Sequence, residues 1–136
     1  MAEITPGLRR EENLLVTNEV AIQFMGVDEA RVLSTPQLIG FLEMTVRNLL
    51  KERLEASQDS VGSEVHLRHL AATPVGMQVR LSAEVVAVQD RRITFKLDAF
   101  DEEEKIGEGT HERFIVHVAR FASRLLAKAA GQPGSQ

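Results

Sequence analysis

The sequence predicts an α+β domain in which one long helix packs against an antiparallel sheet. One segment, from Pro36 to about Ala56, has apolar residues at helical spacing, and after Val61 the chain changes to an alternation of apolar and polar residues. A single helix followed by consecutive strands is typical of α+β layer architectures. The 136 residues are expected to form one domain, 1–136.

The first half of the chain predicts a strand, a connection and a buried helix. Residues 14–25 are rich in Val, Ile and Phe and follow a charged run, which predicts the strand. The partly charged residues 26–33 predict the connection. Thr35 directly precedes a proline, which predicts that it is the N-cap of the helix. Apolar residues cover more than half of the helix circumference, so the helix should be mostly buried, and residues 57–60 predict a polar turn after it.

The second half predicts four strands and a short terminal helix. The strands should begin near Val61, Met77, Ile93 and Ile106. Residues 119–130 favour a helix, and the tail 131–136 should fray. In the strand that follows the helix, strict alternation predicts these inward-facing residues: Val61, Val65, Leu67, His69 and Ala71.

Composition excludes several classes of function. There is no cysteine, which excludes disulfides, thiolate metal sites and a cysteine nucleophile. A net charge of −4 and few aromatic residues argue against nucleic acid as a partner. The longest uncharged stretch, 32–42, is far too short to cross a membrane, and the N-terminus lacks an apolar signal segment. A cytoplasmic location is therefore expected.

Glu43 is the first candidate for chemistry, because its helical neighbours include Ile39, Val46 and Leu50. A carboxylate on an apolar stripe must find hydrogen-bond donors or have a raised pKa, and both conditions suit catalysis. The alternative is a solvated ion pair with Arg47, four residues further along the helix.

His69 and Thr35 are the other two candidates. His69 faces the core by alternation, and the alternative to catalysis is a hydrogen-bonded core histidine. His66 should point to the opposite face of the strand, so a metal site is not expected. Thr35 is either a helix cap only or also a catalytic hydroxyl, at a helix end that favours negative charge.

Two motifs carry a resemblance to a known family. The segment from His69 to His117 contains H-x-A-A-T-P-x-G and I-G-x-G-T-H-E-R, and it resembles the fluoroacetyl-CoA thioesterases, which have the hot-dog fold. In that fold an antiparallel sheet wraps around one long central helix. The resemblance continues more weakly back to Thr35 and covers about three quarters of the chain.

The resemblance implies an acyl-CoA thioesterase with Thr35, Glu43 and His69 as its catalytic residues. It also implies that Gly62 stabilises the oxyanion through its backbone N–H and that Arg113, in the T-H-E-R motif, contributes to the site. Coenzyme A would be part of the substrate, and no other cofactor is implied. We expect a homodimer, because an open sheet leaves edges and apolar surface to cover. Glu43 must then meet His69 in the same subunit or across the dimer.

Several alternatives stay open at this point. The segment before Thr35 is shorter than in the family and lacks the phenylalanines of its lid, so the substrate is expected to be a short or small acyl-CoA, but specificity for fluoroacetyl-CoA is not predicted. The phosphates of coenzyme A need cations, for which Arg80, Arg91, Arg92 and Lys96 are candidates. A binding module that takes acyl-CoA or another small ligand without turnover is the main alternative function. An enoyl-CoA hydratase is disfavoured, because no suitably spaced Asp and His stand near the helix start.

Overall fold

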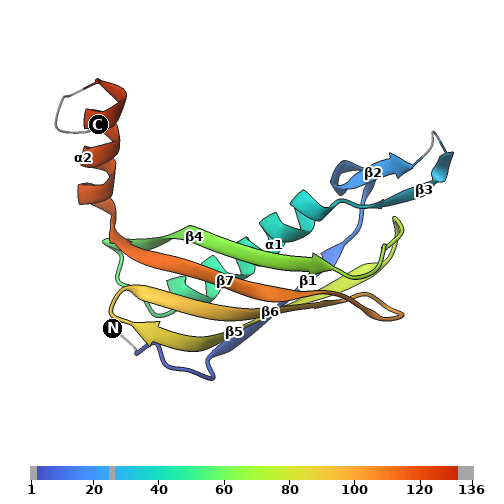
Figure 1. The fold of residues 1–136 in the computed structure, drawn as a ribbon, viewed down its shortest axis with the longest axis horizontal. Coiled ribbons are helices and arrows are strands. Elements are labelled where there is room, and N and C mark those ends of the chain that lie inside the picture. The colour runs from blue at the N-terminus through green and yellow to red at the C-terminus, as the bar shows by residue number, and fades with distance from the viewer. Residues whose placement is uncertain (1–2, 25–26, 132–136) are drawn as a thin grey trace.

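The fold is an antiparallel sheet wrapped around one helix, as the sequence predicts (Figure 1). The structure is a computed structural model, and it describes residues 3–24 and 27–131. Its elements in chain order are β1 (Arg9–Leu15), the short 3-10 helix η1 (Asn18–Val20), β2 (Ala21–Phe24), β3 (Val27–Leu33), α1 (Thr35–Lys51), β4 (Gln58–His69), β5 (Gln78–Gln89), β6 (Arg92–Phe100), β7 (Lys105–His117) and α2 (Val118–Ala129).

The main sheet has five strands in the order β1-β5-β6-β7-β4, and all neighbouring pairs are antiparallel. Helix α1 lies in the concave face of this sheet, and both contribute to one core. Most of the largest fully buried side chains come from α1 and the three central strands, among them Leu38, Leu42, Leu50, Phe95 and Leu97. Strand β4 is left at an open edge, where residues 62–66 are exposed.

The N-terminal third differs from the prediction. The charged run at residues 9–12 belongs to β1, which pairs with β5. Its charges suit an edge strand, where Arg10 forms an ion pair with Glu12 and Glu52. The predicted connection contains β3, which forms a hairpin with β2. The turn of this hairpin, residues 25–26, lies outside the described residues, as do residues 132–136 of the tail.

Helix α1 ends earlier than predicted and has a different cap. It stops at Lys51, and β4 already begins at Gln58, inside the predicted turn. The N-cap is Ser34, whose hydroxyl accepts a hydrogen bond from the backbone N–H of Gln37 at 3.3 Å. Thr35 is therefore not the cap but the first helical residue, and its hydroxyl is left for another partner.

A β-bulge corrects the predicted alternation along β4. The pairing with β7 shifts between Gly62 and Glu64, so the strand has one extra residue there. Val61 pairs with Phe114, which alternates with the buried Arg113 and so belongs to the outer face. The bulge turns Gly62 to the inner face in place of Val61, while His69 keeps its inward position.

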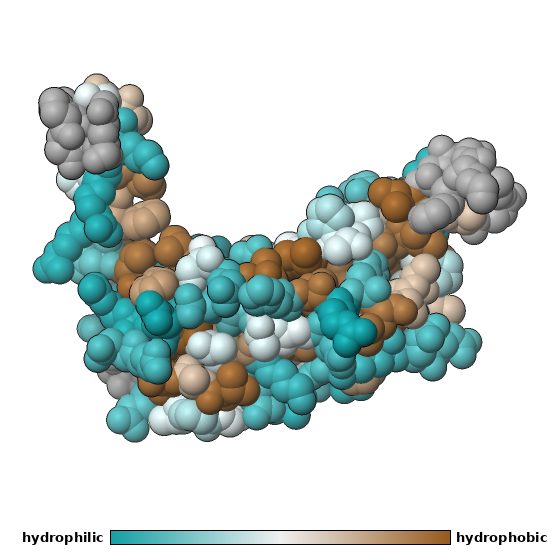
Figure 2. Space-filling view, viewed as in Figure 1, coloured by the Kyte–Doolittle hydropathy of each residue, from teal (hydrophilic) through white to brown (hydrophobic). Residues whose placement is uncertain are grey.

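Two arms project on the same side of the sheet, at opposite ends of β4 (Figure 1). One is the β2–β3 hairpin and the other is α2, in which no residue is buried. Apolar surface lines the trough between the arms (Figure 2). Exposed apolar side chains occur on the elements that border it, including Ile22, Met44, Val65 and Leu125. Within residues 3–24 and 27–131, no helix is long and apolar enough to span a membrane.

Candidate active site

The structure brings Thr35 and His69 together at the start of α1. The Thr35 hydroxyl oxygen lies 2.7 Å from Nδ1 of His69, which is hydrogen-bond distance. The two residues line a pocket of about 380 Å³, whose other walls are apolar and come from β2, β3 and the segment after β4: Ile22, Val32, Leu33, Leu70, Ala71 and Ala72. An apolar pocket with a few convergent polar groups is the usual form of a small-molecule site.

The H-x-A-A-T-P-x-G motif explains why these two side chains meet. The motif starts at His69 and then leaves the sheet in a loop that docks on β3, immediately before the helix. The backbone N–H of Leu33 donates to the carbonyl of Thr73 at 2.9 Å, and Val32 forms an isolated bridge with Pro74. The fully buried Thr73 hydroxyl donates to Asp101 at 2.9 Å, which anchors the loop to the β6–β7 turn. The motif thus fixes the start of α1 against the end of β4.

His69 is a neutral imidazole with one unused nitrogen. Burial lowers its pKa, which favours the uncharged ring at neutral pH. Its Nε2 atom is buried and has no hydrogen-bond partner among the described residues. When Nδ1–H donates to Thr35, Nε2 carries the free lone pair that a general base requires.

Glu43 belongs to a second cluster, further along α1. It lies eight residues after Thr35, which is about 12 Å along the helix axis. Its Oε2 atom is 3.4 Å from Nη1 of Arg113 and 4.0 Å from Nε2 of His111. The predicted alternative, a pair with Arg47, is not found, because Arg47 binds Asp59 at 2.6 Å. Glu43 keeps 38 % of its side chain exposed, so the carboxylate is accessible at the open edge of the sheet.

Arg113 is held in place by the start of β4. Its Nε donates to the hydroxyl of Ser60 and its Nη2 to the carbonyl of Ser60, both at 2.8 Å. Only 5 % of the residue is exposed. Burial lowers the pKa of the guanidinium, while the carboxylates of Glu43 and Asp59 raise it. An arginine fixed in this way presents one N–H, on Nη1, towards Glu43.

His111 is a member of the site that the sequence analysis missed. Its Nδ1 is 2.8 Å from the carbonyl of Glu64, the residue that follows the bulge, and its Nε2 is 3.3 Å from Nη1 of Arg113. Burial, with a contribution from Arg113, lowers its pKa, so the neutral ring donates from Nδ1 and accepts at Nε2. A signal was present in the sequence, because alternation places His111 and Arg113 of T-H-E-R on one inward face.

Gly62 lies directly against the Glu43 carboxylate. A Cβ atom at this position would be 2.9 Å from Oε2 of Glu43, 3.2 Å from Cε1 of His111 and 3.4 Å from Nη1 of Arg113. The glycine therefore leaves the space that the carboxylate occupies.

The five predicted residues form two separate groups within one protomer. Thr35 lies with His69, and Glu43 lies with Gly62 and Arg113. Among the described residues, no group of three or more His, Asp or Glu side chains is placed to hold a metal ion.

Comparison with known proteins assigns the family. Residues 16–119 match the model of the fluoroacetyl-CoA-specific thioesterases. The chain belongs to this family. It is 33 % identical over 97 residues to a fluoroacetyl-CoA thioesterase of Streptantibioticus cattleyicolor, over 71 % of this chain and 70 % of that protein. The predicted resemblance is thereby confirmed.

Solved structures of similar proteins agree with the fold. The fluoroacetyl-CoA thioesterase FlK superposes with a TM-score of 0.85 at 27 % identity, over 93 % of this chain and 98 % of FlK. A point mutant of FlK, solved with fluoroacetate and coenzyme A, gives a TM-score of 0.78 at 29 % identity, over 87 % and 99 % of the two chains. A hot-dog-like protein of Thermanaerovibrio acidaminovorans, 20 % identical over 90 % of this chain and 91 % of that one, gives 0.82. The predicted hot-dog fold is confirmed.

Proposed function

We propose that the protein hydrolyses an acyl-CoA thioester to a free acid and coenzyme A. The observation that carries this proposal is the contact between Thr35 and His69 inside an apolar pocket, in a chain of the fluoroacetyl-CoA thioesterase family. A neutral imidazole with a free nitrogen supplies the general base that thioester hydrolysis requires. A relative binds fluoroacetate and coenzyme A, which supports this class of substrate.

The catalytic unit we propose is a homodimer formed through β4. This strand is 12 residues long and lies at the sheet edge, and its middle is exposed. A second copy of β4 can pair with its open backbone groups and cover this edge. In a two-fold pair the two copies run antiparallel, which brings the His69 end of one copy towards the Gly62 half of the other. Glu43 lies against Gly62. The carboxylate of one subunit therefore approaches the Thr35–His69 pair of its partner.

Each group then has a defined task. Nε2 of His69 removes a proton from water, the oxygen attacks the thioester carbonyl, and the carbon–sulfur bond breaks to release the thiolate, which takes up the proton. Thr35 holds the imidazole through Nδ1. The backbone N–H of Gly62 of the partner subunit stabilises the oxyanion. Glu43 of the partner subunit orients the water and stabilises the imidazolium that forms, and Arg113 fixes that carboxylate.

A second route uses the same groups, with Glu43 as the nucleophile. The carboxylate attacks the carbonyl and expels the thiolate, and water activated by His69 then cleaves the resulting anhydride. Heavy oxygen in the Glu43 carboxylate after repeated turnover in labelled water identifies the anhydride route. Direct attack by water places the label in the released acid only, whereas cleavage of the anhydride at the Glu43 carbonyl leaves label in that carboxylate, which mass spectrometry of the peptide detects.

Release of free thiol from a panel of acyl-CoAs tests the activity. The protein has no cysteine, so it adds no background to a thiol reagent. We expect turnover of at least one small acyl-CoA and a loss of about 10²- to 10⁴-fold in the His69→Ala variant. Binding of acyl-CoA without turnover would instead assign the protein to the non-catalytic modules. Full turnover by Glu43→Gln on every accepted substrate would remove Glu43 from the mechanism.

Mixed dimers test whether the site is shared. His69→Ala and Glu43→Gln homodimers should both be inactive. In a mixed dimer, one site combines the intact His69 of one chain with the intact Glu43 of the other, so about half of the wild-type activity per dimer should return. A mixture that stays inactive, although the chains exchange, would place both residues of each site in one subunit. Sedimentation as a monomer would exclude the dimer itself.

A further inference from the structure

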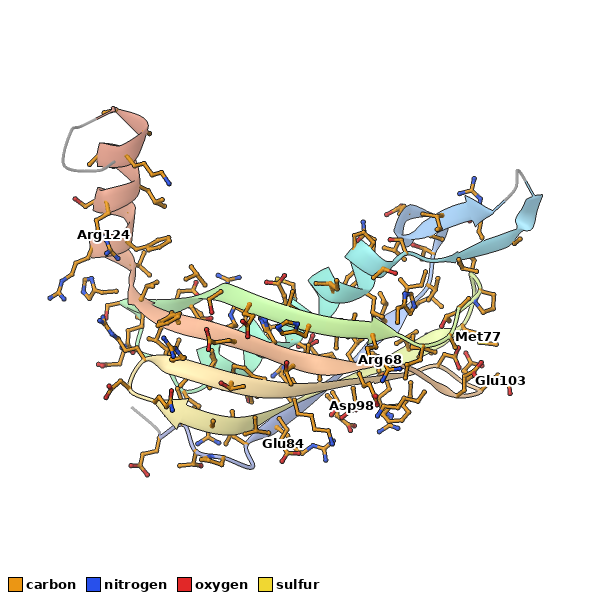
Figure 3. The ribbon with its side chains drawn as sticks, in the orientation of Figure 1. Arg68, Met77, Glu84, Asp98, Glu103 and Arg124 are labelled. Atoms are coloured by element: carbon orange, nitrogen blue, oxygen red, sulfur yellow. The ribbon has the colours of Figure 1, made fainter. Side chains whose placement is uncertain are left out.

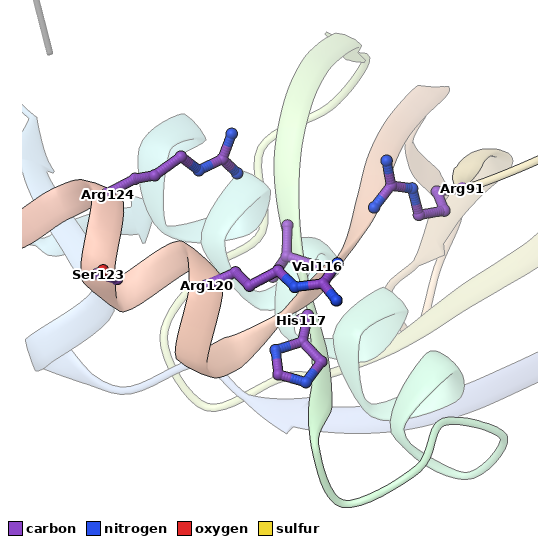
Figure 4. Close-up of a pocket in the computed structure, with 6 residues that line it drawn as sticks. All are labelled: Arg91, Val116, His117, Arg120, Ser123 and Arg124. Carbon is purple, nitrogen blue, oxygen red and sulfur yellow. The ribbon is translucent and has the colours of Figure 1, made fainter. Parts of the chain in front are cut away.

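A basic pocket lies at the base of α2, far from the Thr35–His69 pair of the same chain. It has a volume of about 510 Å³ and is lined by Arg91, Val116, His117, Arg120, Ser123 and Arg124. Arg91 comes from the β5–β6 turn and the other two arginines from α2. Figure 4 shows the Arg91 and Arg124 guanidinium groups extended towards each other, with Arg120 between them.

The three arginines have no carboxylate partner among the described residues, although the chain has 20 acidic residues against 16 Lys and Arg. No carboxylate lines the pocket. Elsewhere in the described part of the chain, arginines form ion pairs with Asp or Glu, among them Arg9, Arg10, Arg47, Arg68, Arg80, Arg92 and Arg113. The concentration of unneutralised cations in one hollow of an acidic protein points to an anionic ligand.

The donor set fits phosphate. Arg120 and Arg124 are four residues apart on one helix face, where like charges repel unless an anion lies between them. Arginine is the preferred partner of phosphate because its planar group donates two parallel hydrogen bonds. Ser123 adds a hydroxyl donor to the same pocket.

The position of the pocket fits the other end of coenzyme A, provided that the site is shared. His117 pairs with Gln58, which lies about 35 Å from His69 along β4. Figure 3 shows Arg124 on α2 at one end of the molecule and Arg68, the residue before His69, towards the other end. In the β4-paired dimer, however, the Gln58 end of one subunit lies beside the His69 end of the other. The base of α2 then lies next to the partner's acyl pocket. A coenzyme A molecule can reach from one to the other, whereas it could not span the length of β4 within one subunit.

We infer that Arg91, Arg120 and Arg124 bind the phosphate groups of a coenzyme A whose acyl end lies in the Thr35–His69 pocket of the partner subunit. This inference rests on the proposed function and gives α2 a role. Of the four cations suggested by the sequence, it retains Arg91. The other three have carboxylate partners, because Arg80 pairs with Glu11, Arg92 with Glu112 and Lys96 with Asp98.

Substrates with and without phosphates test the inference. The double variant Arg120→Gln/Arg124→Gln keeps good helix formers and removes both charges. We expect its KM for acetyl-CoA, or for the best acyl-CoA of the panel, to rise at least tenfold, with kcat unchanged. Its KM for the matching pantetheine thioester, which has no phosphate, should equal that of the wild type. Lys128→Gln removes a charge from the same helix outside the pocket and is the matched control.

The outcomes separate this site from the chemistry. Equal KM changes for both substrates, or none for acetyl-CoA, would overturn the inference. If the wild type hydrolyses no thioester, calorimetric titration with coenzyme A still decides the matter, since loss of binding in the double variant but not in Lys128→Gln supports the site without the activity. In mixed dimers of His69→Ala with the double variant, wild-type KM at half activity confirms binding across the dimer, and a raised KM contradicts it.

Discussion

The α-carbon of Gly62 faces the carboxylate of Glu43 so closely that a Cβ atom there would lie 2.9 Å from Oε2. The β-bulge between Gly62 and Glu64 creates this relationship, because it turns Gly62 to the inner face of the sheet. One extra residue in β4 therefore sets the space in which the candidate catalytic carboxylate is held. His111 stabilises the bulge through the carbonyl of Glu64.

Gly62→Ala should reduce activity far more than stability. The methyl group meets the mobile end of Glu43, which moves aside at little cost but leaves its place beside Arg113. We expect kcat to fall about 10²-fold, as for a displacement of about 1 Å in a catalytic group, while the free energy of unfolding changes by less than about 1 kcal/mol. Thiol-release kinetics and urea unfolding measure the two effects.

Gly109→Ala is the contrasting control, because the obstacle there is backbone. A Cβ on Gly109 would collide with the carbonyl of His66 in the neighbouring strand, and neither strand can yield locally. This variant should lose more than about 2 kcal/mol of stability. A Gly109→Ala protein as stable as the wild type would contradict the structural role of the Gly109 contact. A Gly62→Ala protein with full activity would contradict the catalytic role of the Gly62 contact.

Ser34 and Thr35 should separate helix capping from catalysis. Ser34 caps α1, so Ser34→Ala should cost about 1 kcal/mol of stability. Thr35→Val keeps the shape and removes the hydroxyl that contacts His69, so kcat should fall about 10²-fold with stability nearly unchanged. Thr35→Ser should retain most of the activity. A Thr35→Val protein that is unfolded or fully active would restrict Thr35 to a structural role.

The sequence predicted the long helix and the long strands well, but it predicted the N-terminal hairpin and the β-bulge poorly. The period of apolar residues located α1 and the strands from β4 to β7, because burial on one face is what periodicity records. It predicted one strand over residues 14–25, where the structure has the end of β1, then η1 and β2, and it missed β3, because charged residues in 27–33 interrupt the apolar pattern. The bulge in β4 was also invisible, since one extra residue has no signature in an apolar pattern.

For the candidate site, single residues were predictable but their grouping was not. Thr35, Glu43 and His69 were each identified as candidates from the residues that neighbour them in the predicted helix or strand, and from the family resemblance. The structure separates Glu43 from the other two by about 12 Å along α1, since Glu43 follows Thr35 by eight helical residues. Which residues meet across a dimer depends on strand pairing between chains, and local periodicity does not encode it.

His111 should act as a positioning residue for Glu43 through Arg113. An asparagine reproduces the Nδ1–H donor to Glu64 but has no atom in the place of Nε2, whereas a glutamine oxygen can replace the Nε2 acceptor for Arg113. We expect His111→Asn to lower kcat at least tenfold with KM nearly unchanged, and His111→Gln to retain more of kcat. Equal kcat losses in both variants, matched by equal losses of stability, would indicate a purely structural histidine.

The pH dependence of activity should reflect the buried, neutral His69. Burial lowers its pKa, so the free base persists below the usual value of about 6.5, and the acid limb of kcat/KM should lie below pH 6.5. The unfolded chain takes up a proton at His69 that the folded chain resists. The free energy of unfolding therefore falls as pH drops below about 6.5 and levels off below the folded pKa.

The acid limb of kcat/KM and the pH dependence of the unfolding free energy together test whether His69 is the general base. The residual activity of His69→Gln should lose the acid limb, and the slope of its unfolding free energy against pH should be shallower than that of the wild type. His111 adds a slope of the same sign, because burial lowers its pKa as well, so His111→Gln is the control that changes the stability slope and leaves the acid limb of kcat/KM in place. An acid limb that survives in His69→Gln and disappears in His111→Gln would transfer the role of general base from β4 to β7.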